Sequence, residues 1–311
     1  MLVRMVADGV VRMEDALSDE AMLAIDVVQA ARLYASARRV HDDFIFRETA
    51  RRMAERLATV RLVPQRVLDL GSGDGADETF LRDRFPDAWY CGLDRSLARL
   101  LSVTERRAVS GWRRWTRPAH RPPLVNADFA SLPFAARSFD CLWSNLAIHW
   151  SSAPHRVIAE WSRVTNVGGL LTFSAFGPDT MREVVDAFAQ VDDEKHVLPF
   201  TDLHDYGDML VASGFVTPVV DAERIVLTYA EPADLWRDVR SLGGNAAIGR
   251  IRSLRGRAFR TALDEALATT RGPDGRYRLS LELVFAHAWK GETRKTAAGE
   301  TIVRMPMPRV S

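Results

Sequence analysis

Residues 67–75 read VLDLGSGDG, and this stretch decides the fold. It opens with an apolar run, as expected of a strand that is covered on both faces. Gly71, Gly73 and Gly75 follow, and glycines allow the backbone to turn sharply and to lie close to a ligand. Asp69 is unusual in such a strand, because a buried carboxylate is costly unless a partner satisfies it. The stretch therefore predicts a buried strand that leads into a binding turn.

Strand-like and helix-like segments alternate on the C-terminal side of this turn. Further strands are predicted at 88–94, 124–125, 139–144 and 170–174, with helices at 77–84, 97–109 and 157–164. This alternation is typical of an α/β, doubly wound, mostly parallel sheet. Two late strands, at 224–229 and 277–289, would bring the sheet to seven strands, and helices at 180–190, 203–213, 232–242 and 257–269 would be helical insertions near them.

The chain divides into three parts on this interpretation: a helical N-terminal segment (1–63), a core (64–177) and a C-terminal part that completes the sheet (178–311). The net charge of +1 and the hydrophobic fraction of 47% favour no nucleic-acid or membrane partner. Cys91 and Cys141 both lie in apolar runs, so we expect core residues and neither a disulfide framework nor a metal cluster. Without a predicted signal peptide or membrane helix, a cytoplasmic protein is expected.

Polar side chains follow the predicted strands at their carboxyl ends, where ligands bind in doubly wound sheets. Asp94 lies 23 residues after Gly71, which is the spacing of an acid that accepts hydrogen bonds from ribose hydroxyls. Asp128 ends the third strand and Asn145 follows the fourth. The sequence therefore predicts a nucleoside site, with Asp128 placed to meet the edge of the base.

The identity of the cofactor depends on the charge around the glycine turn. The turn satisfies the relaxed dinucleotide fingerprint G-x-G-x-x-A, so NAD is one candidate. A pyrophosphate prefers backbone N–H groups without nearby acids, whereas Asp69, Asp74 and Asp77 flank this turn. S-adenosylmethionine carries a sulfonium and an ammonium group, so the acids favour it over NAD.

Several segments carry a resemblance to known families. The segments VLDLGSGDG, GLD, ADF and FDCLWSNLAIHW, in this order, resemble the class I S-adenosylmethionine-dependent methyltransferases with their Rossmann-like fold. Residues 44–306, including GGLLTFSAFGPDTMREV, HVLPFTDLHDYGDMLVASGF and DGRYRLSLELVFAHAW, resemble the malonyl-acyl-carrier-protein O-methyltransferases of biotin synthesis. They are also similar to a mitochondrial complex I assembly factor, for which the resemblance implies arginine hydroxylation.

The resemblance implies a role for each residue of the candidate cofactor site. The glycine turn and its acid would hold the amino-acid part of the cofactor, Asp94 the ribose and Asp128 the adenine. Asn145 and Leu146 would form the floor under the methyl group. The full set of implied cofactor residues is Asp69, Gly71, Ser72, Gly73, Gly75, Asp94, Arg95, Asp128, Phe129, Asn145 and Leu146.

The N-terminal segment departs from the family pattern. Residues 30–47 are expected to form a lid over the ligand, or else part of a helix that simply docks on the sheet. The family has a Tyr-Asp pair here, and an ungapped alignment places Arg39 and Val40 at those positions. Tyr34 and the pair at 41–42 lie nearby as substitutes. This departure keeps a non-catalytic binding or assembly protein among the alternatives.

The substrate side of the predicted site rests on fewer residues. The resemblance implies a malonyl thioester whose carboxylate Arg182 would orient, although a surface arginine explains Arg182 equally well. His149 is either a packed core histidine or a substrate contact. Methylation of another small molecule and arginine hydroxylation are the alternative activities, and a coenzyme A thioester is the alternative substrate form.

An arginine tract is the one strongly basic segment that we single out. Residues 106–121 contain six arginines, two tryptophans and no acid. The tract is a solvated loop, a docking site for an acidic acyl carrier protein, or a single-stranded nucleic-acid contact. We do not expect nucleic acid, because the chain has no recognisable nucleic-acid module. The arginines are Arg106, Arg107, Arg113, Arg114, Arg117 and Arg121.

Overall fold

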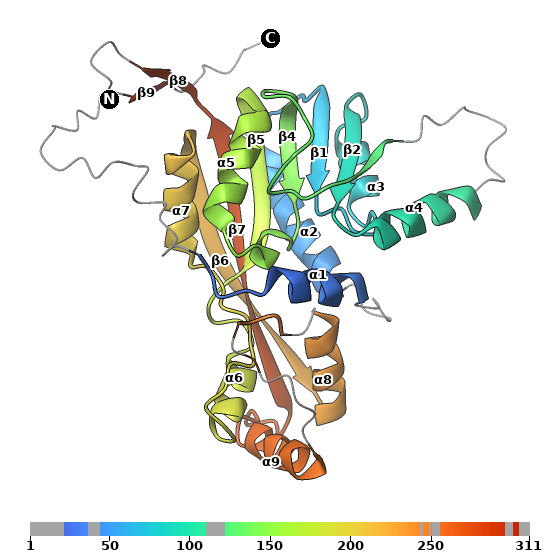
Figure 1. Ribbon diagram of the computed structural model, residues 1–311, viewed down its shortest axis with the longest axis vertical. Coiled ribbons are helices and arrows are strands. Elements are labelled where there is room, and N and C mark those ends of the chain that lie inside the picture. The colour runs from blue at the N-terminus through green and yellow to red at the C-terminus, as the bar shows by residue number, and fades with distance from the viewer. Residues whose placement is uncertain are drawn as a thin grey trace, which may run out of the picture.

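The computed structural model describes residues 22–36, 44–109, 122–242, 245–248, 250, 256–295 and 301–304. Their centre is a seven-stranded sheet with the strand order β3-β2-β1-β4-β5-β7-β6 (Figure 1). The pairs from β3 to β5 are parallel, and β7 runs antiparallel to both of its neighbours. The strands are Arg66–Leu70 (β1), Trp89–Asp94 (β2), Leu124–Asn126 (β3), Phe139–Ser144 (β4), Thr165–Phe176 (β5), Phe215–Tyr229 (β6) and Tyr277–Lys290 (β7). The prediction of a doubly wound, mostly parallel sheet is confirmed.

Helices cover both faces of the sheet, because successive side chains of a buried strand point to opposite sides. On one face, Met53 and Leu81 belong to the buried cluster that contains Val67 of β1. On the other face, Trp161 belongs to the cluster that contains Leu68. The core helices are Phe44–Arg56 (α2), Glu78–Arg84 (α3), Leu97–Val109 (α4), Pro154–Val164 (α5) and Leu203–Ala212 (α7).

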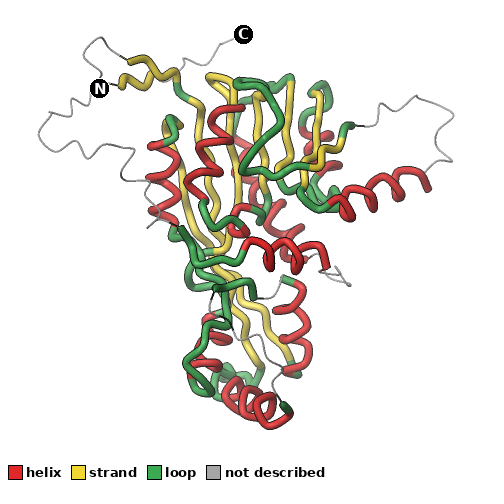
Figure 2. The backbone as a smooth tube through the Cα atoms, viewed as in Figure 1, coloured by secondary structure: helices red, strands yellow, loops and turns green. Residues whose placement is uncertain are grey.

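Strands β6 and β7 run on beyond the rest of the sheet and carry a lower lobe (Figure 2). This lobe contains α6 (Arg182–Ala189), α8 (Pro232–Ser241) and α9 (Arg257–Ala268). Phe188 and Trp236 pack edge to face at its centre, with 5.8 Å between ring centroids. Helix α1 (Val27–Ser36) crosses below the sheet, between the core and this lobe (Figure 1).

The structure extends the predicted elements at three places. Strand β6 begins at Phe215, nine residues before the predicted start at Arg224. Pro218 and Asp221 lower the strand propensity of this segment, and its pairing with β7 is the long-range contact that makes it a strand. Strand β5 begins at Thr165, and a hairpin of β8 (Glu292–Lys295) and β9 (Thr301–Arg304) follows β7.

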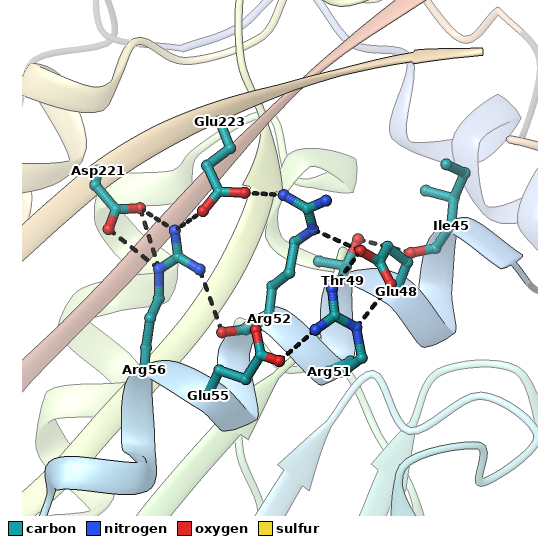
Figure 3. A network of polar contacts seen from close by, with 9 residues as sticks. All are labelled: Ile45, Glu48, Thr49, Arg51, Arg52, Glu55, Arg56, Asp221 and Glu223. Carbon is teal, nitrogen blue, oxygen red and sulfur yellow. Dashed lines mark hydrogen bonds and ion pairs between the residues drawn. The ribbon is translucent and has the colours of Figure 1, made fainter. Parts of the chain in front are cut away.

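An ion-pair network fastens α2 to β6 (Figure 3). The Arg56 guanidinium lies 2.8 Å from Asp221 and 2.7 Å from Glu223, and Arg52 pairs with Glu223 as well. Within α2, Glu48 lies 2.8 Å from Arg52. Because charged networks of this kind couple several residues at once, they hold two elements together better than isolated surface pairs do.

Candidate cofactor-binding site

The glycine turn joins β1 to α3 and is fixed to the end of β2. The backbone N–H groups of Gly71 and Ser72 donate to the carbonyl of Leu93, at 2.8 and 3.0 Å. Gly71, Gly73 and Gly75 have φ values of 76°, 53° and 72°, in the left-handed region that side chains disfavour. A Cβ atom on Gly71 would lie 2.5 Å from the Cβ of Ala147, so a steric clash also excludes larger residues at this position.

Asp94 is the meeting point of three elements. Its Oδ2 accepts hydrogen bonds from the backbone N–H of Gly73, at 2.8 Å, and from the hydroxyl of Tyr34 on α1, at 2.7 Å. Its Oδ1 accepts the N–H of Ser96, at 2.7 Å. The acid predicted to bind ribose therefore lies directly beside the glycine turn, as the fold argument expects. The sequence pattern places Tyr34 only near the expected lid and does not predict this contact.

Arg99, on α4, joins the lid helix to the glycine turn. Its guanidinium lies over the ring of Tyr34, 4.3 Å from the centroid, and donates to the carbonyl of the same residue at 2.8 Å. The same group lies 3.2 Å from Asp74. The charge of Asp74 is thus paired within the protein. The expectation that Asp74 adds to the attraction for a cationic ligand is weakened accordingly.

Asp69 is buried within β1. The hydroxyl of Tyr90, on the neighbouring strand β2, donates to Asp69 Oδ2 at 2.7 Å. Burial raises the pKa of Asp69 well above its ordinary value, and the nearby carboxylates of Asp77 and Asp94 raise it further. A bound cation would have the opposite effect and favour the ionised form. The tyrosine could have been anticipated, since a carboxylate in a buried strand requires a donor.

A chain of hydrogen bonds fixes the end of β4. Asn145 donates through Nδ2 to the carbonyl of Phe46 on α2, at 2.9 Å, and its Oδ1 accepts the hydroxyl of Ser174, at 3.0 Å. The backbone N–H of Leu146 donates to the same hydroxyl oxygen at 3.0 Å. Leu146 has a φ of 48°, which is uncommon for a residue with a side chain. Such a locally strained backbone is typical of a functional site.

The other residues of the predicted cofactor set follow the ends of β2 and β3. Asp128 is exposed, and its Oδ1 accepts the backbone N–H of Ala130 at 2.9 Å, whereas Phe129 is buried. Arg95 is exposed, next to Asp94 in the chain. Trp143 donates to Asp77 Oδ2 at 2.8 Å beneath the turn.

The two candidate substrate residues lie in different surroundings. His149 is buried among aromatic rings, 4.9 Å from the centroid of Phe176 and 5.5 Å from that of Trp150. Burial lowers the pKa of His149 to about 3, so its imidazole is neutral at physiological pH. Arg182 is half exposed at the start of α6, in the lower lobe, with Glu183 at 3.5 Å (Figure 1).

Two buried hydroxyls fit a polar ligand at this site. Ser72 Oγ and Ser96 Oγ are both buried, and neither has a hydrogen-bond partner among the residues that the structure describes. Since buried hydroxyls normally find a partner, a ligand with its own donors and acceptors is the simplest complement. The lid residues Arg39 and Val40, the pair at 41–42, and residues 110–121 of the arginine tract lie outside the described residues.

Comparison with known proteins agrees with this geometry. A family model described as "Methyltransferase domain" matches residues 68–173. The YcgJ protein of Bacillus subtilis has a similar fold, with a TM-score of 0.55 at 19% identity over 79% of this chain and 99% of that one. A putative methyltransferase of Bacillus halodurans matches with a TM-score of 0.54 at 16% identity, over 78% of this chain and 99% of that one.

The fold, the glycine turn and the family model define a class I methyltransferase. The chain is 44% identical to the malonyl-[acyl-carrier protein] O-methyltransferase of Laribacter hongkongensis, over 80% of this chain and 83% of that protein. It is 38% identical to the malonyl-[acyl-carrier protein] O-methyltransferase of Legionella pneumophila, over 85% of this chain and 90% of that protein. The chain belongs to the malonyl-[acyl-carrier protein] O-methyltransferase family. This membership confirms S-adenosylmethionine over NAD as the cofactor.

Proposed function

We propose that this protein transfers the methyl group of S-adenosylmethionine to the free carboxylate of a malonyl group carried by an acyl carrier protein, as a step of biotin synthesis. The observation that carries the proposal is the similarity to proteins of that name over four fifths of the chain. The acids of the site agree with it, since Asp69 and Asp94 are buried where a cationic nucleoside would lie.

The residues proposed to hold the cofactor are those of the glycine turn and the strand ends. Asp69 and the glycines would face its amino-acid part, Asp94 its ribose, and Asp128 with Phe129 its base. When bound, the cofactor supplies an electrophilic methyl group. A carboxylate is already a nucleophile, so the protein needs to hold its oxygen in line and to exclude water.

We further propose that His149 contacts the substrate as a neutral donor. A buried imidazole without charge donates a hydrogen bond to a carboxylate without forming an ion pair that would reduce its nucleophilicity. The aromatic rings around His149 exclude water from the same region. Arg182, half exposed beside Glu183 at the start of α6, is the second candidate for a contact with the substrate carboxylate.

The partner is proposed to be an acidic acyl carrier protein that the arginine tract of residues 106–121 attracts. We propose the cytoplasm as the compartment, because Cys91 and Cys141 are free, buried thiols and not a disulfide pair.

Incubation of the protein with malonyl-carrier protein and methyl-labelled S-adenosylmethionine tests the proposal. The expected result is a mass gain of one methyl group on the malonyl-carrier protein. The Asp94→Ala variant is the control for dependence on this site. If the wild-type protein binds the cofactor but leaves the carrier protein at its original mass, the substrate assignment is wrong.

A further inference from the structure

Two buried aromatic residues flank Asp69 on the neighbouring strands, Tyr90 on β2 and Trp143 on β4. On β2, Gly92 stands directly opposite Asp69, and Tyr90 lies two residues earlier on the same face of the sheet. Gly92 has no side chain that could partner the carboxylate. The hydroxyl of Tyr90 takes that place and donates to Asp69 Oδ2 at 2.7 Å.

Tyr90 is the one hydrogen-bond donor that the Asp69 carboxylate has within the described part of the chain. On β4, Trp143 stands opposite Asp69, but its indole N–H donates to Asp77 Oδ2 at 2.8 Å. The hydroxyl of Tyr90 binds Oδ2, so Oδ1 of Asp69 keeps its lone pairs for a ligand. A carboxylate that is held through one oxygen presents the other in a fixed direction.

The tyrosine is itself held firmly and keeps its proton. Its ring is buried in the cluster that contains Val67 and Leu81. Burial raises the pKa of Tyr90 well above its ordinary value, and the carboxylate of Asp69 raises it further. The hydroxyl is therefore protonated, and remains a donor, throughout the physiological pH range.

The hydrogen bond also acts on the charge of Asp69. Burial raises the pKa of Asp69, whereas the hydrogen bond from Tyr90 lowers it, because a donor stabilises the ionised carboxylate. An ammonium group binds an ionised carboxylate more strongly than the neutral acid. The other titratable groups that act on Asp69 or feel its charge do not favour ionisation: they are a buried thiol and three acids, Cys91, Asp77, Glu78 and Asp94.

We propose that Tyr90 is a positioning residue for the cofactor: it holds the Asp69 carboxylate so that Oδ1 meets the ammonium group of S-adenosylmethionine. The inference rests on the proposed role of Asp69 and extends it to a residue that acts on the cofactor only through this acid. Tyr90 should therefore affect ligands that carry the amino-acid part of the cofactor, and it should not affect ligands that lack this part.

Tyr90→Phe tests the proposal, because it removes the hydroxyl and keeps the ring. Calorimetry would compare S-adenosylhomocysteine with 5′-methylthioadenosine, which has the nucleoside but no amino-acid part. We expect the Kd for S-adenosylhomocysteine to rise about fivefold at pH 7, the effect of losing one hydrogen bond. The Kd for 5′-methylthioadenosine should not change. The rise should be larger at pH 6 than at pH 8, because the pKa of Asp69 is higher without the hydrogen bond.

Tyr206→Phe is the matched control. Tyr206 is a fully buried tyrosine in the cluster on the other face of the sheet, so its substitution also removes a buried hydroxyl. Both ligands should bind this variant as they bind the wild type.

A double-mutant cycle shows whether Tyr90 acts through Asp69. In the Asp69→Asn background, Tyr90→Phe should lower the affinity for S-adenosylhomocysteine no further. The proposal is overturned by unchanged affinity in Tyr90→Phe, by an equal loss for both ligands, or by an undiminished loss in the Asp69→Asn background. Unchanged affinity in Asp69→Asn alone contradicts the role of Asp69, and the proposal for Tyr90 falls with it. Methyl transfer by the wild type to malonyl-carrier protein is measured separately, so a wrong substrate assignment remains distinguishable from a wrong role for Tyr90.

Discussion

The hydroxyl of Tyr34, on helix α1, donates a hydrogen bond of 2.7 Å to Oδ2 of Asp94, the acid at the end of β2. The same oxygen also accepts the N–H of Gly73. A carboxylate oxygen has two lone pairs, so these two donors fill its capacity. A ribose diol that pairs with both oxygens of Asp94 must therefore replace the tyrosine hydroxyl.

Replacing Tyr34 with phenylalanine should strengthen cofactor binding. The ring would keep its place over Arg99, and only the competing hydroxyl would be lost. We expect the Kd for S-adenosylhomocysteine to fall roughly fivefold, equivalent to about 1 kcal/mol for one hydrogen bond. Isothermal titration calorimetry measures this. A weaker affinity in Tyr34→Phe would mean that the hydroxyl contacts the ligand instead of competing with it.

Replacing Asp94 with alanine should weaken cofactor binding. The ribose would lose its acceptor, which is worth roughly 1 kcal/mol or more when the acceptor is charged. Asp128→Ala is the comparison, and we expect a smaller loss because Asp128 is exposed to water. Unchanged affinity in a folded Asp94→Ala protein would refute the role proposed for this acid.

Asparagine in place of Asp69 should affect stability and binding in opposite directions. Burial raises the pKa of Asp69 above the ordinary value of 3.8, so stability is lost as pH rises from that value through the raised pKa. Asp69→Asn removes this loss, and we expect a higher thermal midpoint at pH 8 that changes less between pH 4 and pH 8. Affinity for S-adenosylhomocysteine should fall roughly tenfold, because the ligand ammonium loses a charged partner. A variant with lower stability at both pH values would contradict the first part.

His149 should make the fold sensitive to acid. Its folded pKa of about 3 lies below the ordinary value of 6.5, so under acidic conditions the unfolded chain binds a proton that the folded chain does not. Stability from this group is complete above pH 6.5 and is lost as pH falls toward 3. At pH 5 the loss is about 2 kcal/mol. Guanidinium unfolding of wild type and His149→Leu at pH 7 and pH 5 measures it, and an equal loss in both proteins would exclude His149 as the cause.

Alanine at Gly71 should damage the glycine turn more than alanine at a comparable glycine elsewhere. Gly71 and Gly275 have similar φ values of 76° and 70°, but an added Cβ has no neighbour within 4 Å at Gly275. Both substitutions therefore carry a similar energetic penalty for alanine at positive φ. Only Gly71→Ala also brings the new Cβ into contact with Ala147. We expect Gly71→Ala to be less stable than Gly275→Ala by roughly 2 kcal/mol, the scale of an overpacked core. Equal stabilities would show that Ala147 moves away without cost.

The sequence predicts the core of the fold better than its edges. Strands β1, β2 and β4 are short apolar runs, and their limits follow from local pattern alone. The first half of β6 depends on its pairing with β7, more than 60 residues away, and no local pattern reports that contact.

A similar limit applies to the candidate site. The acids at the strand ends can be predicted because the topology brings carboxyl ends together. Their partners cannot, since Tyr34 reaches Asp94 across 60 residues and Arg99 neutralises Asp74 from another helix. Side-chain pairing of this kind depends on where helices dock, which the sequence pattern leaves open.

The ion pairs between α2 and β6 also have a consequence for synthesis on the ribosome. Arg56 and Glu223 are 167 residues apart in the sequence. At a synthesis rate of about 5–20 residues per second, roughly ten to thirty seconds pass between the synthesis of α2 and that of its partner strand. Stalled chains that end before residue 221 should leave α2 open to protease. The carbonyl of Phe46, on the same helix, accepts a hydrogen bond from Asn145. The candidate cofactor site would therefore be the last part of the nascent chain to fold, and a truncated chain would lack it.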